Sequence, residues 1–477
     1  MSLGSIWFPL VMALFAFGLP SNRWRPWLLP ASGLAHLLFF ALGITAEQVP
    51  ADSHWLALDP LGKLVLGLIS VLFLPCSFYA AGYLNRRGER SNRIFCSCLL
   101  VFLAMMSLVC WSQHLGLLWV AIDATTLASG PLIYFNRTPR SIEAAWKYLM
   151  VCSVGIALAL LGSLFLAYAS LHGGEESSLI FGDLLLHAPQ LSKPWVHAGF
   201  VLLLVGYGTK MGLAPMHTWK PDAYGEAPGV VGALLAGGLA NCAFLAILRV
   251  HQVCIAAGEG EYASRLLLFV ALLSMACAAV FMVGQKDFKR MLAYSSIEHM
   301  GILALGVGVG GLGAQGALLH MVNNGLTKGV LFLSAGNLHR AYGDKTTDAV
   351  RGALIRSPLS GWLFLLGFLA ITGSPPFAPF VSEFSILRSM VESGRHLPAA
   401  AFLAFLLVIF VGMGKTVLSV VQGNPPEGAD QAGEREGVFT SLPIVMLMGA
   451  VLMLGVWIPE PLSSLVDSAA RFLELKS

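Results

Sequence analysis

Apolar runs of about twenty residues recur along the whole chain, and each is long enough to cross a lipid bilayer as an α-helix. They leave little room for the surface of a soluble domain. Of the 477 residues, 56% are hydrophobic and only 12% are charged, against roughly 25% charged residues in a typical soluble domain. We therefore expect an all-α polytopic membrane protein.

Polar and Gly/Pro breaks divide the apolar sequence into about fourteen predicted spans. The first run has no basic segment before it and no small-residue cleavage site after it, so we interpret it as a retained helix. The predicted spans lie near 3–20, 28–46, 61–84, 95–112, 114–135, 143–171, 195–222, 225–250, 263–284, 292–310, 314–339, 357–390, 399–421 and 441–467.

The charged loops alternate in sign along the chain. Because loops rich in Lys and Arg stay in the cytoplasm, we expect both termini on the other side, the periplasmic side of an inner (plasma) membrane. The basic residues follow odd-numbered spans: Arg23, Arg25, Arg86, Arg87, Arg90, Arg93, Arg137, Arg140, Lys286, Lys289, Arg290, Arg340, Lys345, Arg351 and Arg356. The acidic residues follow even-numbered spans: Glu47, Asp52, Glu175, Glu176, Glu259 and Glu261.

Charge and cysteine usage exclude several classes of function. A net charge of +3 leaves no basic excess for a nucleic-acid partner. The eight cysteines lie almost all in apolar segments and none forms a C-x-x-C pair, so we expect no iron–sulfur cluster and no structural zinc. No nucleophile–base set or phosphate loop is recognisable either. We therefore expect no metal, no cofactor and no redox centre in the chain itself.

Ionisable side chains stand inside the predicted spans, where each costs roughly 2.5–3.5 kcal/mol on insertion scales, so their number indicates function. His320, Asn324 and Lys328 recur every four residues and therefore share one helix face. Glu298 and His299 are adjacent, so we favour His299 facing inward and Glu298 at a helix contact. The ionisable residues at membrane depth are Asp123, Lys210, Glu298, His299, His320, Lys328, Glu383 and Lys415.

Other charged residues near the spans have structural interpretations. Glu143 and Lys147 have the i, i+4 spacing of an interfacial ion pair. Lys63 stands at a span end, where its ammonium group reaches the interface. For Lys415 both alternatives, interface and interior, remain open. No second histidine stands at the spacing of a metal-ligand pair, so we do not interpret His217 as a metal ligand. It belongs either to a polar path or to a structural contact.

Two predicted spans contain residues that interrupt a helix, at Lys210–His217 and at Thr372–Pro379. Proline removes a backbone donor, so each helix should break in mid-membrane. Breaks at matching positions are typical of inverted repeats with the transport path between them. We therefore expect broken helices seven and twelve in two inverted five-helix units. The predicted divisions are N-terminal helices at 1–94, units at 95–250 and 263–421, and a last helix with tail at 441–477.

Three ordered motifs point to a known family. They read KMGLAPMHTWKPDAYGEAPGVVGALLAG, QKDFKRMLAYSSIEHMG followed by HMVNNGLTKGVLFLSAGNL, and PPFAPFVSEF. They resemble the motifs of antiporter-like membrane subunits of respiratory complex I, Mrp-type cation/proton antiporters and membrane-bound hydrogenases. With AIDATTLASGPLIYFNRTPRSIEAAWKYL, Asn241 and the compact length, the chain looks most like the component F branch of hydrogenase-4-type complexes.

The resemblance implies a proton path along the membrane midplane. Two departures from the family pattern bear on it. Asp123 is one methylene shorter than the usual glutamate, which puts a direct pair with the seventh-helix lysine in doubt. Asn241 stands where the eighth helix usually has a lysine, so water would have to act at that step. The residues that we expect to form the path are Asp123, Lys210, Asn241, His299, His320, Lys328 and Glu383.

The resemblance also implies partners: other membrane subunits and a peripheral redox module, either a nickel–iron hydrogenase or a complex I-like module. We expect Lys210 to stay protonated while the opposite charge of Asp123 is near. A pulse from the redox module would separate the pair. The proton would then pass by water near Asn241 to Lys328 and His320, and leave by Glu383, with histidine suited to a relay because it titrates near neutral pH.

Two alternatives remain open. A subunit of a Mrp-type sodium/proton antiporter would have the same fold, and carboxylates beside a helix break are suited to sodium. A purely structural membrane subunit would only dock its neighbours. The charges beside both breaks argue against the structural alternative.

Overall fold

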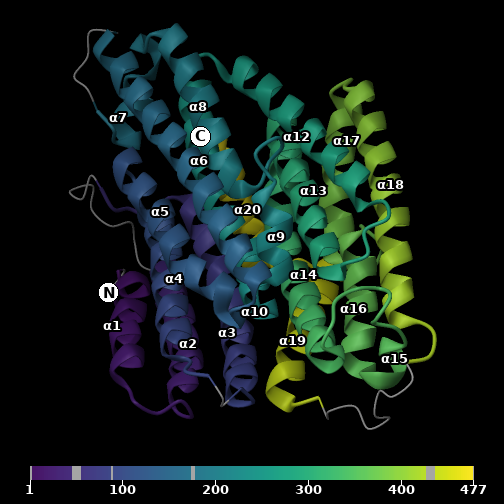
Figure 1. The fold of residues 1–477 in the computed structure, drawn as a ribbon. Coiled ribbons are helices and arrows are strands. Elements are labelled where there is room, and N and C mark those ends of the chain that lie inside the picture. Colours follow the sequence, from purple (N-terminus) through teal and green to yellow (C-terminus); the bar gives the residue numbers. More distant parts are fainter. Residues whose placement is uncertain (1–2, 46–54, 88–89, 173–177, 426–435, 476–477) are drawn as a thin grey trace.

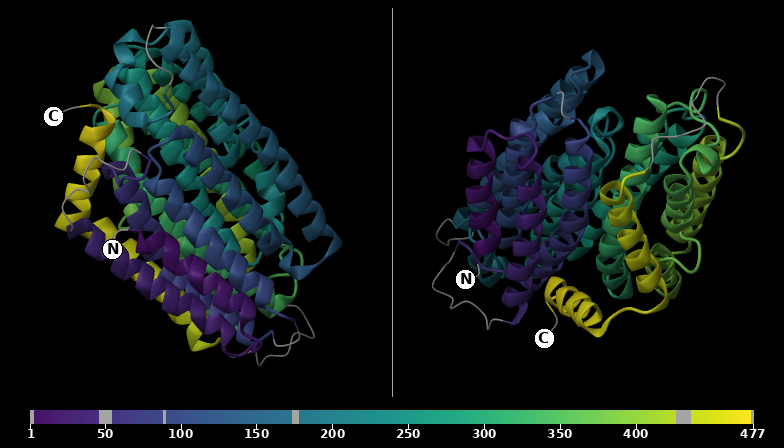
Figure 2. Two further views of the ribbon diagram at one scale, coloured as in Figure 1. Left: turned by 90° about the vertical axis from the view of Figure 1, so that its left-hand side faces the viewer. Right: turned by 90° about the horizontal axis from the view of Figure 1, so that it is seen from below.

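The chain folds into a bundle of helices that run alongside one another (Figure 1). The computed structural model describes residues 3–45, 55–87, 90–172, 178–425 and 436–475. The early helices form one side of the bundle and the late helices the other (Figure 2). Four acidic loop residues named above, Glu47, Asp52, Glu175 and Glu176, lie outside the described residues.

Helices occupy the predicted ranges in order. The first six ranges contain α1 (Gly4–Gly18), α2 (Leu28–Thr45), α3 (Pro60–Asn85), α4 (Arg93–Trp111), α5 (Leu115–Ile133) and α6 (Pro139–His172). The next five contain α8 (Lys193–Met211) with α9 (Trp219–Glu226), α10 (Gly229–Leu234) with a π-helical turn (Leu235–Leu239) and α11 (Ala240–Ala256), α12 (Gly260–Met282), α13 (Phe288–Val309) and α14 (Leu312–Tyr342). The last three contain α16 (Pro358–Ile371) with α17 (Ala378–Glu392), α18 (His396–Val421), and α19 (Val438–Val456) with α20 (Glu460–Leu473). Short helices α7 (Phe181–Leu186) and α15 (Ala353–Arg356) lie in connections.

Ten helical segments of the described chain are long and apolar enough to cross a membrane. The predicted class, an all-α polytopic membrane protein, is confirmed. Helices α1 and α16 are apolar but shorter. Helix α14 is long, but it carries the polar stripe of His320, Asn324 and Lys328, which lowers its mean hydropathy. The number of fourteen spans stays a prediction.

The last predicted span, 441–467, is wrong as a single helix. Helix α19 ends at Val456, the backbone of Trp457 is extended, and α20 begins after Pro459. Proline cannot donate the backbone hydrogen bond that a continuous helix would need there. Helix α20 packs against α3 and α14 on the surface of the bundle (Figure 2). The C-terminal region therefore contains an additional short helix.

Both predicted helix breaks are present. Helix α8 ends at Met211 and α9 begins at Trp219, while α16 ends at Ile371 and α17 begins at Ala378. Each helix ends near a glycine in the left-handed region, Gly212 with φ +88° and Gly373 with φ +66°. Side chains with a Cβ rarely adopt this conformation, so glycine permits both chain reversals. A cis proline follows each glycine.

The charged loops sort to opposite ends of the bundle. At one end the basic loops contact each other: Arg25 donates to Asn92, and Arg87 donates to Asn136. At the same end Lys345 pairs with both Glu226 and Asp287. Glu259 lies at the other end, paired with Lys193 and His197. Among the described residues, the basic loops therefore gather at one end of the bundle and Glu259 lies at the other.

A buried ion pair connects three helices near the end of the bundle where Glu259 lies. Arg249 of α11 is 1% exposed, and its Nε lies 2.9 Å from Asp59 Oδ2 at the start of α3. Its remaining donors reach the carbonyl oxygens of Val109, Cys110 and Ser112 at the end of α4. These carbonyls have no partner within their own helix, so the guanidinium group satisfies three of them at once.

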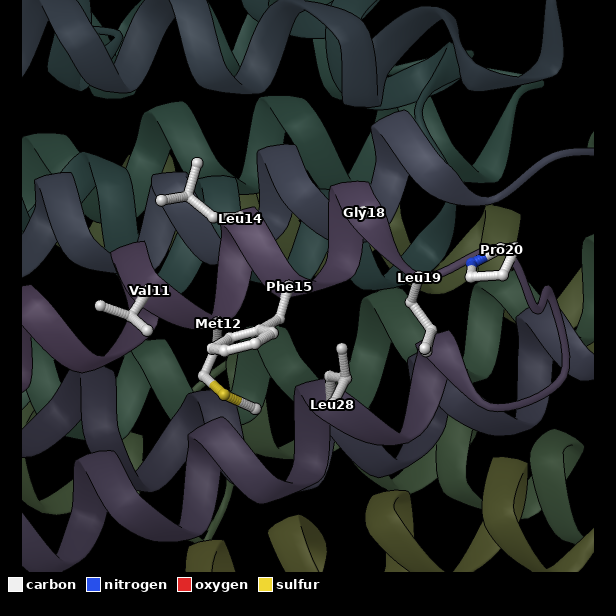
Figure 3. Close-up of a pocket in the computed structure, with 8 residues that line it drawn as sticks. All are labelled: Val11, Met12, Leu14, Phe15, Gly18, Leu19, Pro20 and Leu28. Atoms are coloured by element: carbon white, nitrogen blue, oxygen red, sulfur yellow. The ribbon is translucent and has the colours of Figure 1, made fainter.

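An open apolar groove lies between α1 and α2 (Figure 3). Its volume is about 870 Å³, and its wall includes Val11, Leu14, Phe15 and Leu28. Every lining side chain is apolar, so the groove offers no polar group that would orient a ligand. It also lies on the outer edge of the bundle, away from the buried charges described below.

We expect Arg249→Leu to lower the free energy of unfolding by about 3–5 kcal/mol, because Asp59 and three carbonyl groups would lose their buried partner. Thermal unfolding of the purified protein in detergent would measure the loss. Arg265→Leu is the matched control, since the pair of Arg265 with Glu261 is exposed and should contribute less than about 1 kcal/mol. Equal stability of the two variants would contradict this assignment.

Candidate functional site

Lys210 occupies the last turn of α8, directly before the first break, and is 1% exposed. Its ammonium group donates to Thr126 Oγ1 at 2.6 Å and to the Tyr148 hydroxyl at 2.7 Å. It also lies 4.6 Å from the centre of the Tyr148 ring. Helices α5 and α6 therefore hold this buried cation with two neutral oxygens and an aromatic face.

Asp123 does not pair directly with Lys210. In the described part of the chain no carboxylate oxygen lies within 4.0 Å of Lys210 Nζ. Asp123 stands one turn before Thr126 on α5 and is partly exposed, between the exposed side chains of Val120 and Leu127. The short aspartate therefore faces the edge of the bundle, in line with the doubt that its length raised.

Lys220 is a buried cation that the sequence analysis did not single out. It lies in the first turn of α9, is fully buried, and donates to the carbonyl oxygen of Met211 at 2.8 Å. Its ammonium group is 3.5 Å from the carbonyl oxygen of Ser296 on α13 and lies over the ring of Tyr224. The residue stands in the polar segment HTWKPDAYGE at the end of a predicted span, where a lysine looks interfacial.

Gly212 makes room for this lysine. A Cβ at Gly212 would lie 2.5 Å from Lys220 Cδ and 2.8 Å from its Nζ. At the second break, a Cβ at Gly373 would meet the carboxylate of Glu383 in the same way. Each break therefore combines a left-handed glycine with an ionisable side chain that folds back over it.

Lys328 of α14 donates to Ser295 Oγ of α13 at 2.8 Å and is fully buried. Glu298, one turn later on α13, is only 3% exposed, and its carboxylate lies 3.8 Å from His299 Nε2. Glu298 thus belongs to the same buried cluster as His299, whereas we expected it at a separate helix contact. His299 faces inward, as expected.

His299 and His320 form a direct hydrogen bond between α13 and α14, with 2.9 Å from His299 Nδ1 to His320 Nε2. The other ring nitrogen of His320 is 2.9 Å from Ser382 Oγ on α17. Glu383 Oε1 lies 3.9 Å from His299 Nδ1. Two imidazoles bonded in this way share one proton between their facing nitrogens, so a proton can shift from ring to ring.

The side chains of His299, His320 and Glu383 also have possible metal-ligand atoms within 4.8 Å of one another, which is the spacing of a metal site. The facing nitrogens of His299 and His320 are engaged with each other, however, and Ser382 takes the remaining nitrogen of His320. A metal ligand needs a free lone pair directed at the ion. The arrangement therefore fits a hydrogen-bonded chain better than a metal centre.

In the part of the chain that the structure describes, two buried asparagines have polar atoms without a protein partner. Asn241 donates to Gly237 O within its own helix, and its Oδ1 has no partner. Asn324, between His320 and Lys328 on α14, has no partner for either side-chain polar atom. Buried polar groups of this kind usually bind ordered water.

The remaining sequence interpretations have clear outcomes. The predicted ion pair of Glu143 and Lys147 is confirmed at 2.7 Å. Lys415 is exposed and Lys63 is half-buried at the start of α3. His217 is 7% exposed, and its Nδ1 has no hydrogen-bond partner. Of the expected path residues, the structure brings His299, His320 and Glu383 into one cluster with Lys328 nearby, and leaves Lys210 at the first break.

The sequence of residues 112–410 matches the profile of a family described as NADH:quinone oxidoreductase/Mrp antiporter, TM. This range contains both helix breaks and every residue that we expect to form the path, from Asp123 to Glu383. The chain belongs to this family. The resemblance seen in its motifs is thereby confirmed, and we refer to the protein below as an antiporter-like subunit.

Individual relatives cover almost the full length of this antiporter-like subunit. It is 34% identical over 466 residues to a hydrogenase-4 component F homolog of Methylacidiphilum infernorum, covering 95% of this chain and 96% of that protein. A chain of the archaeal membrane-bound sulfane sulfur reductase has the same fold, with a TM-score of 0.88 at 21% identity over 99% of this chain and 97% of its own. A chain of the Mrp complex from Dietzia sp. DQ12-45-1b gives 0.87 at 20% identity, over 99% and 97%.

We expect Tyr148→Phe to lower the free energy of unfolding by about 1.5–3 kcal/mol, because the buried ammonium group of Lys210 would lose one of its two oxygen acceptors. Chemical or thermal unfolding in detergent would measure this. Tyr134→Phe serves as the control, since Tyr134 is exposed and removing its hydroxyl should leave stability unchanged. A Tyr148→Phe variant as stable as this control would show that the hydroxyl does not hold Lys210.

Proposed function

We propose that this antiporter-like subunit conducts protons through the membrane arm of a redox-driven complex. The observation that carries the proposal is the buried series of ionisable groups between the two helix breaks, from Lys210 on α8 to Glu383 on α17. Ionisable groups are costly in apolar surroundings, so a buried series of them indicates a function. The family to which the chain belongs, with its quinone oxidoreductase and antiporter members, supports the same function.

The path would begin at Lys210, whose side-chain nitrogen is hydrogen-bonded to two hydroxyl groups. Asp123 lies one turn of α5 from Thr126, so its charge acts on Lys210 without a direct pair. A movement of α5 would change that support and release the proton. Water bound near Asn241 would then take part in the transfer to the second cluster.

The second cluster would pass the proton from Lys328 to the histidine pair and on to Glu383. Lys328 is bonded to Ser295, one turn before Glu298 and His299. The bond between His299 and His320 shifts a proton between rings, and Glu383 accepts it at the second break. Neutral histidine suits this step because small changes of environment move its protonation across physiological pH.

The partners would be other membrane subunits and a peripheral redox module, a nickel–iron hydrogenase or a complex I-like module. The names of the relatives, hydrogenase-4 and sulfane sulfur reductase, support a redox module, and both solved structures are multi-subunit membrane complexes. The protein would then act as a translocase subunit without a redox centre of its own. Purification in mild detergent followed by mass spectrometry of the associated proteins tests this assignment.

A subunit of a Mrp-type sodium/proton antiporter is the second candidate. The match in fold to a chain of a Mrp complex and the buried carboxylate of Glu383 beside a break favour it. Stimulation of transport by sodium would distinguish it from a redox-driven proton path. A subunit that only docks its neighbours would show neither activity.

We expect Asp123→Asn and Lys210→Ala each to lower coupled proton transport by about tenfold or more, equivalent to a barrier raised by about 1.4 kcal/mol. The reason is that each variant removes one of the charges whose interaction controls release of the proton. Dye-quenching assays on vesicles with the assembled complex, with redox turnover recorded in parallel, would measure it. Lys415→Ala, on an exposed position, is the control; wild-type transport in both path variants would refute the proposed roles of Asp123 and Lys210.

The basic end of the bundle would face the cytoplasm, with both termini on the periplasmic side of the inner membrane. We expect alkaline phosphatase fused after residue 477 to be active in a bacterial host, because it folds on the periplasmic side. The same reporter fused after Arg90, in a basic loop, should be inactive. Phosphatase activity only in the loop fusion would show that the protein has the opposite orientation in the membrane.

A further inference from the structure

The proposed path has a gap between its two clusters. Lys210 is held by α5 and α6, whereas Lys328 is held by α13, and the two ammonium groups have no hydrogen-bond partner in common. Asn241 does not close the gap by itself. Its amide cannot accept and release a proton at neutral pH, and it is tied to its own helix through Gly237.

We propose that Lys220 carries the proton across this gap, as a third lysine between Lys210 and Lys328. This inference rests on the proposed function. On one side, the Lys220 ammonium group contacts the carbonyl oxygen of Met211, the residue that follows Lys210. On the other side it approaches the carbonyl oxygen of Ser296, and the neighbouring Ser295 binds Lys328.

The electrostatic surroundings of Lys220 suit a residue that carries a proton only transiently. In the described residues no carboxylate oxygen lies within 4.0 Å of its ammonium group, so no ion pair fixes the charge there. The titratable groups that act with or on it are Lys328, Cys152, Tyr224, His217 and His299. An unpaired buried ammonium group is costly, which makes the neutral amine accessible.

Like charges on Lys220 and Lys328 repel, because the two groups bind adjacent residues of one helix turn. A proton on one lysine therefore favours the neutral form of the other. In the transfer step the ammonium form of Lys220 gives one proton to a water molecule. The same water molecule gives one proton to the neutral amine of Lys328. The step changes the charge of each lysine by one and involves no electron transfer.

The first break positions Lys220 for this role. Its side chain folds back over Gly212, where a Cβ would collide with it, and so reaches the end of α8. The same contact has a purely structural interpretation. Met211 O is one of the carbonyl groups left free at the end of α8, and a cation stabilises a helix C-terminus. The experiment must therefore separate a proton carrier from a cap.

Two substitutions separate them. Lys220→Gln keeps an N–H donor for Met211 O, and Lys220→Arg keeps both the donor and the positive charge. Neither side chain can release a proton near neutral pH, since arginine stays protonated in proteins. We expect both variants to assemble with normal redox turnover but to transport protons about tenfold more slowly. A cap would be rescued by Lys220→Arg, and that rescue would overturn the proposal; if the larger arginine prevents assembly, Lys220→Gln alone decides.

Lys289→Gln is the matched control. Lys289 is also buried and also donates to a backbone carbonyl, that of Ala227, but it lies at the basic end of α13. Its variant should transport at the wild-type rate. Lys210→Ala, measured in the same vesicles, separates the two proposals. Slow transport in Lys210→Ala with wild-type transport in both Lys220 variants would refute the role of Lys220 alone, whereas wild-type transport in all three would refute the proposed function as well.

Discussion

The need to satisfy free backbone groups at the two helix breaks organises the centre of this protein. Within a bilayer every exposed N–H or C=O must find a partner in the protein or in enclosed water. At the first break Lys220 binds Met211 O, Trp219 donates to Thr209 O, and Ser274 accepts from the backbone of Ala214. The breaks therefore draw polar and charged side chains into the bundle.

The partners of these charges differ between the ends and the centre of the bundle. At the ends, cations pair with carboxylates, as in Arg249 with Asp59 and Lys345 with Glu226. In the centre, Lys210 and Lys328 bind hydroxyl groups, and the histidines bind each other. A carboxylate holds a cation in one protonation state, whereas a neutral hydroxyl can stabilise either form. The centre is thus suited to moving protons and the ends to holding the fold.

The sequence predicted the fold class, both breaks and the burial of Lys210, Lys328 and Glu383, because long apolar runs and mid-span prolines have few alternatives in a membrane. The sequence-based prediction was wrong or incomplete where the local sequence pattern suggests a different position from the one that the residue has in the fold. Lys220 stands in a polar segment that looks interfacial, yet the chain folds back at Gly212 and buries it. Residues 442–458 are apolar throughout, and the prolines on either side of Glu460 indicate that a second helix begins there. The distance between Asp123 and Lys210 depends on how α5 and α8 pack, which no local pattern encodes.

The central claim is that a single path joins the two breaks, and a double variant tests it most directly. Proton transport should be measured for Lys210→Ala, for Glu383→Gln and for the combination, in vesicles that contain the assembled complex. If both residues lie on one serial path, the double variant transports no more slowly than the slower single variant. If the two breaks serve independent routes, each single variant keeps the transport of the other route, and the double variant loses both routes and is slower than either single variant. That second result would contradict the account.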